Sequence, residues 1–210
     1  MAKNIIDVCW TMYRSNTTFD FIAFVMKEQK KMIFLYHILN LYVVKLFLVV
    51  LGKIFKHDYY RYFYIGLLKG YHRNELISYV EQFYQNFLQT KKIDFTFDLL
   101  SKLKNKDDII LCSASLDIIV EKIASDLNVK YFASTLLFEN EVCLGKIGSD
   151  LLYSKHDIFS KEHINYVITD NLSDYKLIEK AKKPIVLSTQ KNLKFWEERN
   201  IHVSYIFDGV

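Results

Sequence analysis

Polar side chains that could bind a metal ion or attack an electrophile follow three separate apolar runs. Asp7 ends the first run and Thr11 follows it, Ser113 comes after the second, and Asp170 and Asp174 follow the third. Because the carboxyl ends of parallel strands meet at one edge of a sheet, we expect these side chains to converge on one crevice. Clustered acidic groups need a cation, and oxygen ligands with open positions for water suit Mg²⁺.

A basic side chain is available near the same edge. Lys155 lies just upstream of the third apolar run, where its ammonium group could offset the acidic charge. The three cysteines, Cys9, Cys112 and Cys143, form no CxxC pair, and the six histidines show no close ligand spacing. The sequence therefore predicts neither a disulfide framework nor a zinc site, and it favours a reducing, cytoplasmic compartment.

The apolar runs and the segments between them predict an α/β fold with a Rossmann-like parallel sheet core. Buried strands are expected at residues 4–8, 108–112, 166–169, 184–187 and 202–207. The expected crossover helices lie at 116–127, 174–181 and 193–199. A hairpin is expected from 131–138 and 141–147, with a corner at Glu139-Asn140 and with Gly145 and Gly148 closing it.

The segment from about residue 15 to residue 91 differs in composition from the rest of the chain. It is rich in Leu, Tyr, Phe and Lys, lacks proline and offers few turn signals, which predicts an all-helical insertion. The insertion leaves after the first strand and returns before the second, above the sheet edge where α/β proteins bind ligands. We therefore predict a helical cap at 15–91 over a core formed by 1–14 and 92–210.

Four motifs together resemble those of the haloacid dehalogenase superfamily, in its phosphoserine-phosphatase-like branch with a helical cap. The motifs are Asp7-Val8-Cys9-Trp10-Thr11, Leu111-Cys112-Ser113-Ala114-Ser115, Lys155, and Thr169-Asp170-Asn171-Leu172-Ser173-Asp174. Each motif alone is weak, since DxxxT or DxxxD occurs often by chance. Four in the right order at strand ends make a specific signal that spans nearly the whole core.

The resemblance implies a phosphoryl-transfer enzyme with covalent catalysis. Asp7 would attack phosphorus to form an aspartyl-phosphate. Ser113 would hydrogen-bond a phosphoryl oxygen, Lys155 would neutralise charge around the nucleophile, and Thr11 would also contact the substrate. These are roles carried over from the family onto matching positions.

The resemblance also implies a Mg²⁺ site. Asp7 and Asp170 would supply carboxylate ligands, and Cys9 would supply its backbone carbonyl. Asp174 would support the ion directly or through water. The metal would shield the anionic phosphate from the anionic nucleophile.

The sequence departs from the family at Cys9, where phosphatases usually carry a second Asp that protonates the leaving oxygen and later activates water. With a reference pKa near ~8.5, a thiol is largely neutral at pH 7, and losing a positioned acid/base typically costs roughly 10²–10⁴-fold. Trp10 stands where Gly is common, and it could narrow the crevice or pack under the cap. The alternative function is a catalytically impaired scaffold that acts through protein or membrane association.

Residues 33–55 form an apolar stretch close to the ~20 residues that span a bilayer. Lys45 lies near its middle, and a single crossing would place Asp7 and Ser113 on opposite sides of the membrane. Seven basic residues and two acidic ones lie between residues 27 and 61, a pattern that could rest on anionic lipid. Of the two remaining interpretations, buried cap helices and an interfacial surface, we favour buried helices.

Composition and charge limit the partners. The chain has 51% hydrophobic residues, which argues against disorder, and a net charge of +4, which is too mild to indicate nucleic acid without a recognition motif. Asp7 interrupts the apolar run that a signal peptide would need, so export is not expected. We expect a phosphorylated small molecule, such as a lipid or sugar phosphate, and peripheral membrane contact through the cap remains open.

Overall fold

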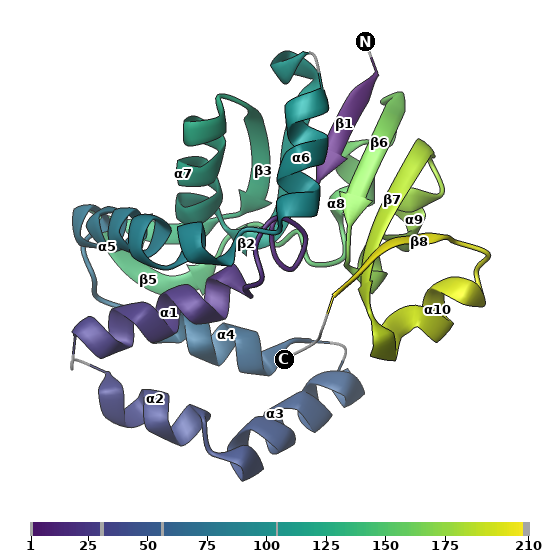
Figure 1. Ribbon diagram of the computed structural model, residues 1–210. Helices are drawn as coiled ribbons and strands as arrows, with labels where there is room; N and C mark the ends of the chain where they lie inside the picture. The colour runs from purple at the N-terminus through teal and green to yellow at the C-terminus, as the bar shows by residue number, and fades with distance from the viewer. Residues whose placement is uncertain (1, 30–31, 56, 104, 208–210) are drawn as a thin grey trace.

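A six-stranded parallel sheet forms the centre of the computed structural model, which describes residues 2–29, 32–55, 57–103 and 105–207 (Figure 1). The strand order is β3-β2-β1-β6-β7-β8, so the direction of winding reverses between β1 and β6. The strands are β1 (Lys3–Ile6), β2 (Ile109–Leu116), β3 (Lys130–Ser134), β6 (Ile164–Thr169), β7 (Ala181–Thr189) and β8 (Val203–Phe207). The predicted α/β, Rossmann-like fold is confirmed.

The central strands bury side chains on both faces, which explains why the sequence shows apolar runs rather than alternation. In β1, Ile6 packs into one hydrophobic cluster and Ile5 into the other. In β2, Leu111 and Cys112 separate in the same way. A one-residue shift of either strand would exchange these two sets, so the register of the sheet is strongly specified.

Helices cover both faces of the sheet. The first cluster includes side chains of α6 (Asp94–Lys102) and α7 (Asp117–Leu127). The second includes side chains of α8 (Lys155–Ile158), α9 (Tyr175–Ile178) and α10 (Leu193–Glu197). The 3-10 turns are η1 (Leu88–Lys91), η2 (Lys106–Asp108), η3 (Leu172–Asp174) and η4 (Gln190–Asn192). The helix expected at 174–181 is shorter than predicted, because β7 already begins at Ala181.

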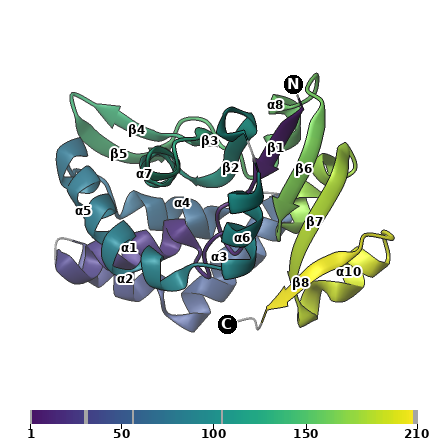
Figure 2. The same ribbon diagram turned by 45° about the horizontal axis from the view of Figure 1, so that its top comes forward.

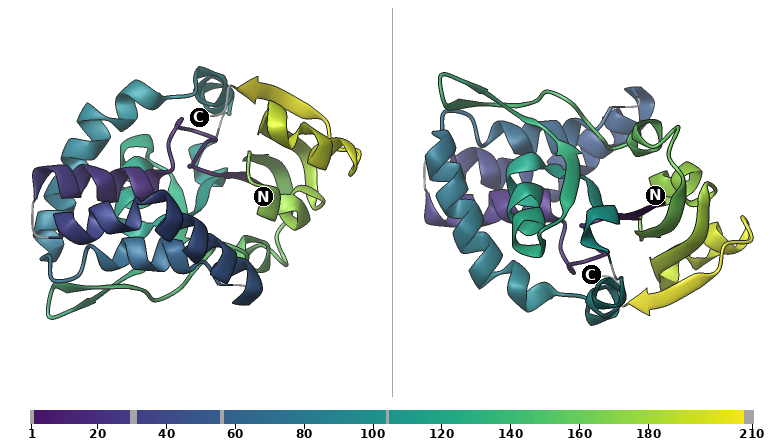
Figure 3. Two further views of the ribbon diagram at one scale, coloured as in Figure 1. Left: turned by 90° about the horizontal axis from the view of Figure 1, so that it is seen from below. Right: turned by 90° about the horizontal axis from the view of Figure 1, so that it is seen from above.

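The described residues of the segment 15–91 form helices and no strand. The α-helices are α1 (Thr17–Glu28), α2 (Ile33–Leu39), α3 (Tyr42–Phe55), α4 (Tyr59–Gly66) and α5 (Arg73–Asn86). Helices α1 to α4 lie below the carboxyl end of β1 in Figure 1, and Figure 3 (left) shows them from below, in front of the sheet. The division into a core and a cap at the predicted boundaries stays a prediction.

The preference for buried helices at 33–55 is wrong. Among the described residues of α2 and α3, only Leu39 and Leu48 are buried, and most of the apolar side chains face outward. The two helices pass together as a membrane-spanning candidate by length and composition, but they are bent by 68° at their junction. Among the described residues, no single helix is long and apolar enough to cross a bilayer.

The predicted hairpin exists but is shorter and shifted. Its strands are β4 (Leu136–Glu139) and β5 (Val142–Ile147), visible at the upper left of Figure 2. Residues 131–134, expected in the first arm, belong to β3 in the main sheet. The turn is formed by Asn140 and Glu141, both at positive φ, as a two-residue hairpin turn requires.

Gly145 does not close the hairpin but lets it approach α4. Its φ is +63°, and an added Cβ would lie 3.1 Å from the Cα of Gly66. The backbone of β5 also pairs with residues outside the hairpin, since Cys143 N donates to Tyr71 O and Gly70 N donates to Cys143 O, both at 2.8 Å. These contacts fix α4 to the hairpin.

Candidate active site

The predicted site residues gather at the reversal point of the sheet. Asp7 follows β1, Asp170 follows β6, and Ser113 lies in β2. The backbone N–H of Asp7 donates to the carbonyl of Ile168 at 2.9 Å, which ties the two central strand ends together. A cavity of about 130 Å³ opens here, and its lining includes Asp7, Cys9 and Ser113.

Lys155 is the charge partner of Asp7. Its Nζ lies 3.0 Å from Asp7 Oδ2 and 2.8 Å from Asp174 Oδ2, and all three side chains are buried. The Thr169 hydroxyl also donates to Asp174 Oδ2, at 2.7 Å. Burial would lower the pKa of Lys155, but Asp174 and Asp7 outweigh it and raise the pKa above its ordinary value. Lys155 is therefore a fixed positive charge beside the predicted nucleophile.

The Asp7 carboxylate is held by its neighbours yet remains costly to ionise. Burial raises its pKa above the ordinary value, and the charge of Lys155 opposes this only in part. The backbone N–H of Val8 donates to Oδ1 at 2.8 Å. A buried carboxylate oriented by one N–H and one ammonium group is suited to nucleophilic attack.

Thr11 positions Asp170. Its hydroxyl donates to Asp170 Oδ1 and accepts from the Asp170 N–H, each at 3.0 Å. Thr11 is fully buried and does not line the cavity. The hydrogen-bonding capacity of Thr11 is directed at Asp170, and its predicted contact with substrate stays a prediction.

Ser113 lies beside a cluster of hydroxyl groups. Its Oγ accepts from the N–H of Ser115 at 3.3 Å. The Oγ of Ser115 lies 2.6 Å from Thr17 Oγ1 and 3.3 Å from Thr18 Oγ1. The first turn of α1 is thereby joined to the carboxyl end of β2, and the helical segment contributes Thr18 and Phe19 to the walls of the cavity.

The thiol of Cys9 contacts the same cluster of hydroxyl groups. Its Sγ lies 3.0 Å from Thr17 Oγ1. Burial, followed by the charge of Asp7, raises the pKa of the Cys9 thiol to about 11. At neutral pH this group is a thiol rather than a thiolate, so it cannot act as a base.

Trp10 adopts neither of the two placements considered from the sequence. Its ring stacks on Phe207 at a centroid distance of 6.0 Å and an interplanar angle of 4°. It lines a different cavity of about 470 Å³, together with Asp170. Its φ is +53°, a left-handed conformation that costs a non-glycine residue roughly 1 kcal/mol or more.

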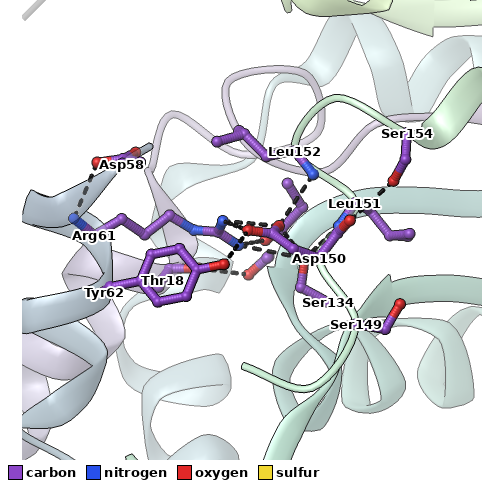
Figure 4. A network of polar contacts seen from close by, with 12 residues as sticks. Thr18, Asp58, Arg61, Tyr62, Ser134, Ser149, Asp150, Leu151, Leu152 and Ser154 are labelled. Atoms are coloured by element: carbon purple, nitrogen blue, oxygen red, sulfur yellow. Dashed lines mark hydrogen bonds and ion pairs between the residues drawn. The ribbon is translucent and has the colours of Figure 1, made fainter. Parts of the chain in front are cut away.

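An ion pair that the sequence analysis missed lies beside the cavity, whose lining includes Arg61. Arg61 on α4 is buried and binds both carboxylate oxygens of Asp150, at 2.8 and 2.7 Å (Figure 4). Tyr62 and Ser134 also donate to Asp150, at 3.2 and 3.1 Å. Burial raises the pKa of Asp150, but the hydrogen bonds and charge of Arg61 outweigh it and hold the pKa below its ordinary value.

Arg61 also reaches the carboxyl end of β2, next to Ser113. Its Nη2 donates to the carbonyl of Ala114 at 2.5 Å. The helix itself is fixed at the same point, because the Asp58 side chain caps α4 by accepting from the Arg61 N–H at 3.1 Å. In the sequence Arg61 was only one basic residue among seven, and a lone Arg within an aromatic run, Tyr59 to Tyr64, was the one available signal.

Asp7 and Asp170 are the carboxylates that would hold Mg²⁺ at this site. Burial and the charge of Asp7 raise the pKa of Asp170 well above its ordinary value, and a cation between the two carboxylates would relieve that repulsion. Among the described residues no three His, Cys, Asp or Glu side chains are grouped to hold a metal. The predicted site therefore needs the carbonyl of Cys9 and water. Asp174 would act through water, since its Oδ2 already bonds Lys155 and Thr169.

Comparison with known proteins places the fold. No protein-family profile and no curated protein sequence matches the chain. A Bordetella pertussis Tohama I protein of unknown function is similar in structure, with a TM-score of 0.73 and 14% identity over 100% of both chains. Phosphoserine phosphatase in its apo form has a TM-score of 0.60 and 20% identity, over 97% of this chain and 94% of that one.

A third structure agrees with these two. A HAD family hydrolase from Salmonella enterica serovar Typhi has a TM-score of 0.61 and 17% identity, over 99% of this chain and 67% of that one. At these identities the likeness concerns the fold, and it coincides with the motif order and with the gathering of Asp7, Ser113, Lys155 and Asp170 at one sheet edge. The chain therefore has the haloacid dehalogenase fold in the form found in phosphoserine phosphatases.

Proposed function

We propose that the chain is a Mg²⁺-dependent phosphoryl-transfer enzyme of the phosphomonoester phosphatase type, with Asp7 as nucleophile. The observation that carries the proposal is the buried pair between Asp7 Oδ2 and Lys155 Nζ at 3.0 Å, beside a cavity lined by Ser113. Similar structures include phosphoserine phosphatases, one of them described as a phospho-aspartyl intermediate analogue. The substrate class is a phosphorylated small molecule, including lipid and sugar phosphates.

In the proposed reaction an Asp7 oxygen forms a bond to phosphorus as the ester P–O bond breaks. Lys155 holds the nucleophile and offsets charge on the phosphoryl group, and the Ser113 hydroxyl donates to a phosphoryl oxygen. Water then cleaves the aspartyl-phosphate, releasing phosphate and restoring Asp7. Mg²⁺, held by Asp7, Asp170 and the Cys9 carbonyl, would supply shielding between the anionic phosphate and the nucleophile.

Cys9 makes the second step the slow one. Its protonated thiol can give a proton to a leaving alkoxide, which is the stronger base. It cannot take a proton from the attacking water at neutral pH, because its own pKa is about 11. We therefore expect the aspartyl-phosphate to accumulate.

The test is phosphate release from an aryl phosphate with Mg²⁺, comparing the wild type with Asp7→Asn. Asp107→Asn, which changes an exposed carboxylate in η2, is the matched control. We expect release from the wild type and the control only, with phosphate covalently bound to the wild-type protein in a mass spectrum after quenching. Equal background release from all three proteins would instead favour the scaffold alternative.

A further inference from the structure

Helices α2 and α3 expose an unusually large apolar area. Phe34 is 78% exposed, Val43 75% and Phe47 62%. The α2–α3 surface comprises Phe34, Leu35, Leu41, Tyr42, Val43, Leu46, Phe47, Val49, Val50, Ile54 and Phe55, all exposed. Both helices lie at the bottom of Figure 1, on the side away from the sheet. A helix that is apolar around most of its circumference requires a nonpolar environment.

The geometry suits insertion into one leaflet rather than a crossing. α3 has 14 residues, which corresponds to about 21 Å, against about 30 Å for the hydrocarbon core of a bilayer. The bend of 68° between α2 and α3 prevents the pair from acting as one straight span. Helices of this kind lie in the interface, with the apolar face at the boundary between headgroups and acyl chains.

The charges around the surface are complementary to anionic lipid. Lys45 and Lys53 are exposed along α3, and the acidic Asp58 is engaged as the cap of α4. A second copy of the chain would bring an identical basic rim against this one, which is unfavourable. An anionic headgroup layer would attract these basic side chains, so electrostatics favours docking on lipid.

Three adjacent cavities, all with Asp58 in their lining, lie between α3 and Asp7, and we call them together the groove. Next to α3 is a cavity of about 600 Å³ whose lining includes Leu48, His57 and Tyr153. It shares His57 and Tyr153 with a cavity of about 220 Å³, which in turn shares Leu152 with the cavity that contains Asp7. The wall nearest α3 is apolar and basic, whereas the wall nearest Asp7 is polar.

From these observations we infer that the α2–α3 surface rests on an anionic bilayer and that the groove brings the terminal phosphate of a membrane lipid to Asp7. The acyl or prenyl chain stays at the apolar end of the groove, and the phosphate reaches Lys155 and Ser113. The docking step stands on the exposed surface and its charges. The substrate class rests also on the proposed phosphoryl-transfer function.

Docking is tested by sedimentation with vesicles of phosphatidylcholine, with and without about one-third phosphatidylglycerol. Val43, Phe47 and Ile54 follow one face of α3, and changing all three to Ser should reduce binding to the anionic vesicles by about 100-fold or more. The matched control changes Ile77, Leu137 and Ile206, exposed apolar residues on α5, β4 and β8, to Ser. It should bind as the wild type does.

Two results would overturn the docking step. One is equal vesicle binding by the two triple variants. The other is a wild type that does not bind vesicles but is a dimer in analytical ultracentrifugation, while the α3 variant is a monomer. That result would mean that the α2–α3 surface is covered by a second copy of the chain. Because all three α3 positions are exposed, unchanged thermal unfolding should accompany the loss of binding.

The substrate class is tested by phosphate release from phosphatidate in the anionic vesicles and from a water-soluble aryl phosphate. The α3 variant should lose release from the lipid and keep release from the aryl phosphate, since none of its three positions lines the groove. Release from the aryl phosphate alone by a vesicle-bound wild type would overturn the lipid substrate. Vesicle binding without release from either compound would reject the phosphoryl-transfer function and leave docking intact.

Discussion

The ammonium group of Lys155 lies 3.0 Å from the carboxylate of Asp7, at the first turn of a four-residue helix that begins at Lys155 itself. Asp174 holds the same ammonium group from the other side at 2.8 Å. The pair is thus part of a buried triad with two carboxylates and one cation. Its net charge is negative, so one further cation is needed for balance when both carboxylates are ionised.

Replacing Lys155 with Met should lower stability as well as activity. The substitution keeps the side-chain volume but leaves two buried carboxylates without a counter-charge, which typically costs about 3–5 kcal/mol. Urea unfolding at pH 7 measures the loss, and Lys161→Met, at an exposed position, is the matched control. A decrease in the free energy of unfolding smaller than that of the control variant would mean that the three side chains are not all ionised.

Mg²⁺ should raise the melting temperature by binding the folded chain only. Asp170→Asn should abolish this shift, and Thr11→Val should weaken it, because Thr11 orients Asp170 through two hydrogen bonds of 3.0 Å. The experiment is a thermal-shift titration with MgCl₂, with Asp107→Asn as control. Shifts of equal size in Asp170→Asn and the control would rule out the site.

The Arg61–Asp150 pair should give a pH-dependent contribution to stability. The pKa of Asp150 is lowered in the folded state, so its contribution is present above the unfolded pKa of about 3.9 and is lost as the pH falls through the folded value. Asp150→Asn should therefore cost about 2 kcal/mol at pH 7, discounted because Asp150 is partly exposed. The difference from the wild type should shrink below about pH 4.

The measurement for this prediction is urea unfolding of both proteins at several pH values between 3 and 7, with Asp107→Asn alongside. Arg61 keeps its hydrogen bond to the Ala114 carbonyl in the variant, so the fold should persist. A difference that does not change with pH would mean that Asp150 contributes by packing or neutral hydrogen bonds rather than by charge.

The sheet and the residues at its edge were predictable because their signals are local. Asp7, Ser113 and Asp170 each follow a short apolar run, and topology alone then brings the three strand ends together. The positions of Thr11 and Asp174 were also predicted to be at the site. Their hydrogen-bond partners were not, because the choice between substrate, metal and protein partners depends on distances that no spacing encodes.

The features that escaped prediction depend on tertiary contacts. Arg61 and Asp150 are 89 positions apart and belong to no repeating pattern. Residues 131–134 were assigned to the hairpin because a hairpin arm and a strand of the main sheet both require an extended, apolar segment, and the sequence does not distinguish the two. The apolar pattern of α3 indicates that the helix needs nonpolar surroundings, but it does not say whether a protein core or a lipid layer supplies them.

The sharpest prediction concerns Cys9. Wild-type protein should show a burst of product equal to about one turnover and then slow release, because the protonated thiol cannot activate water for dephosphorylation. Cys9→Asp should raise the steady-state rate, up to the roughly 10²–10⁴-fold span of general acid–base catalysis, less the cost of a new charge beside Asp7. Thr17, whose hydroxyl lies 3.0 Å from the thiol, can donate to the new carboxylate.

The matched control is Cys9→Asn, which has the shape of Asp but no group that can exchange a proton near neutral pH. Rapid-quench kinetics should use Mg²⁺ and an aryl phosphate with a weakly basic leaving group, which needs no proton from residue 9. They should show the burst in the wild type and in Cys9→Asn, and its disappearance in Cys9→Asp. A wild type that turns over quickly and is slowed by Cys9→Asp would refute the missing-base account. The native reaction would then be one that needs no base at this position, such as transfer from an activated phosphate to an acceptor other than water.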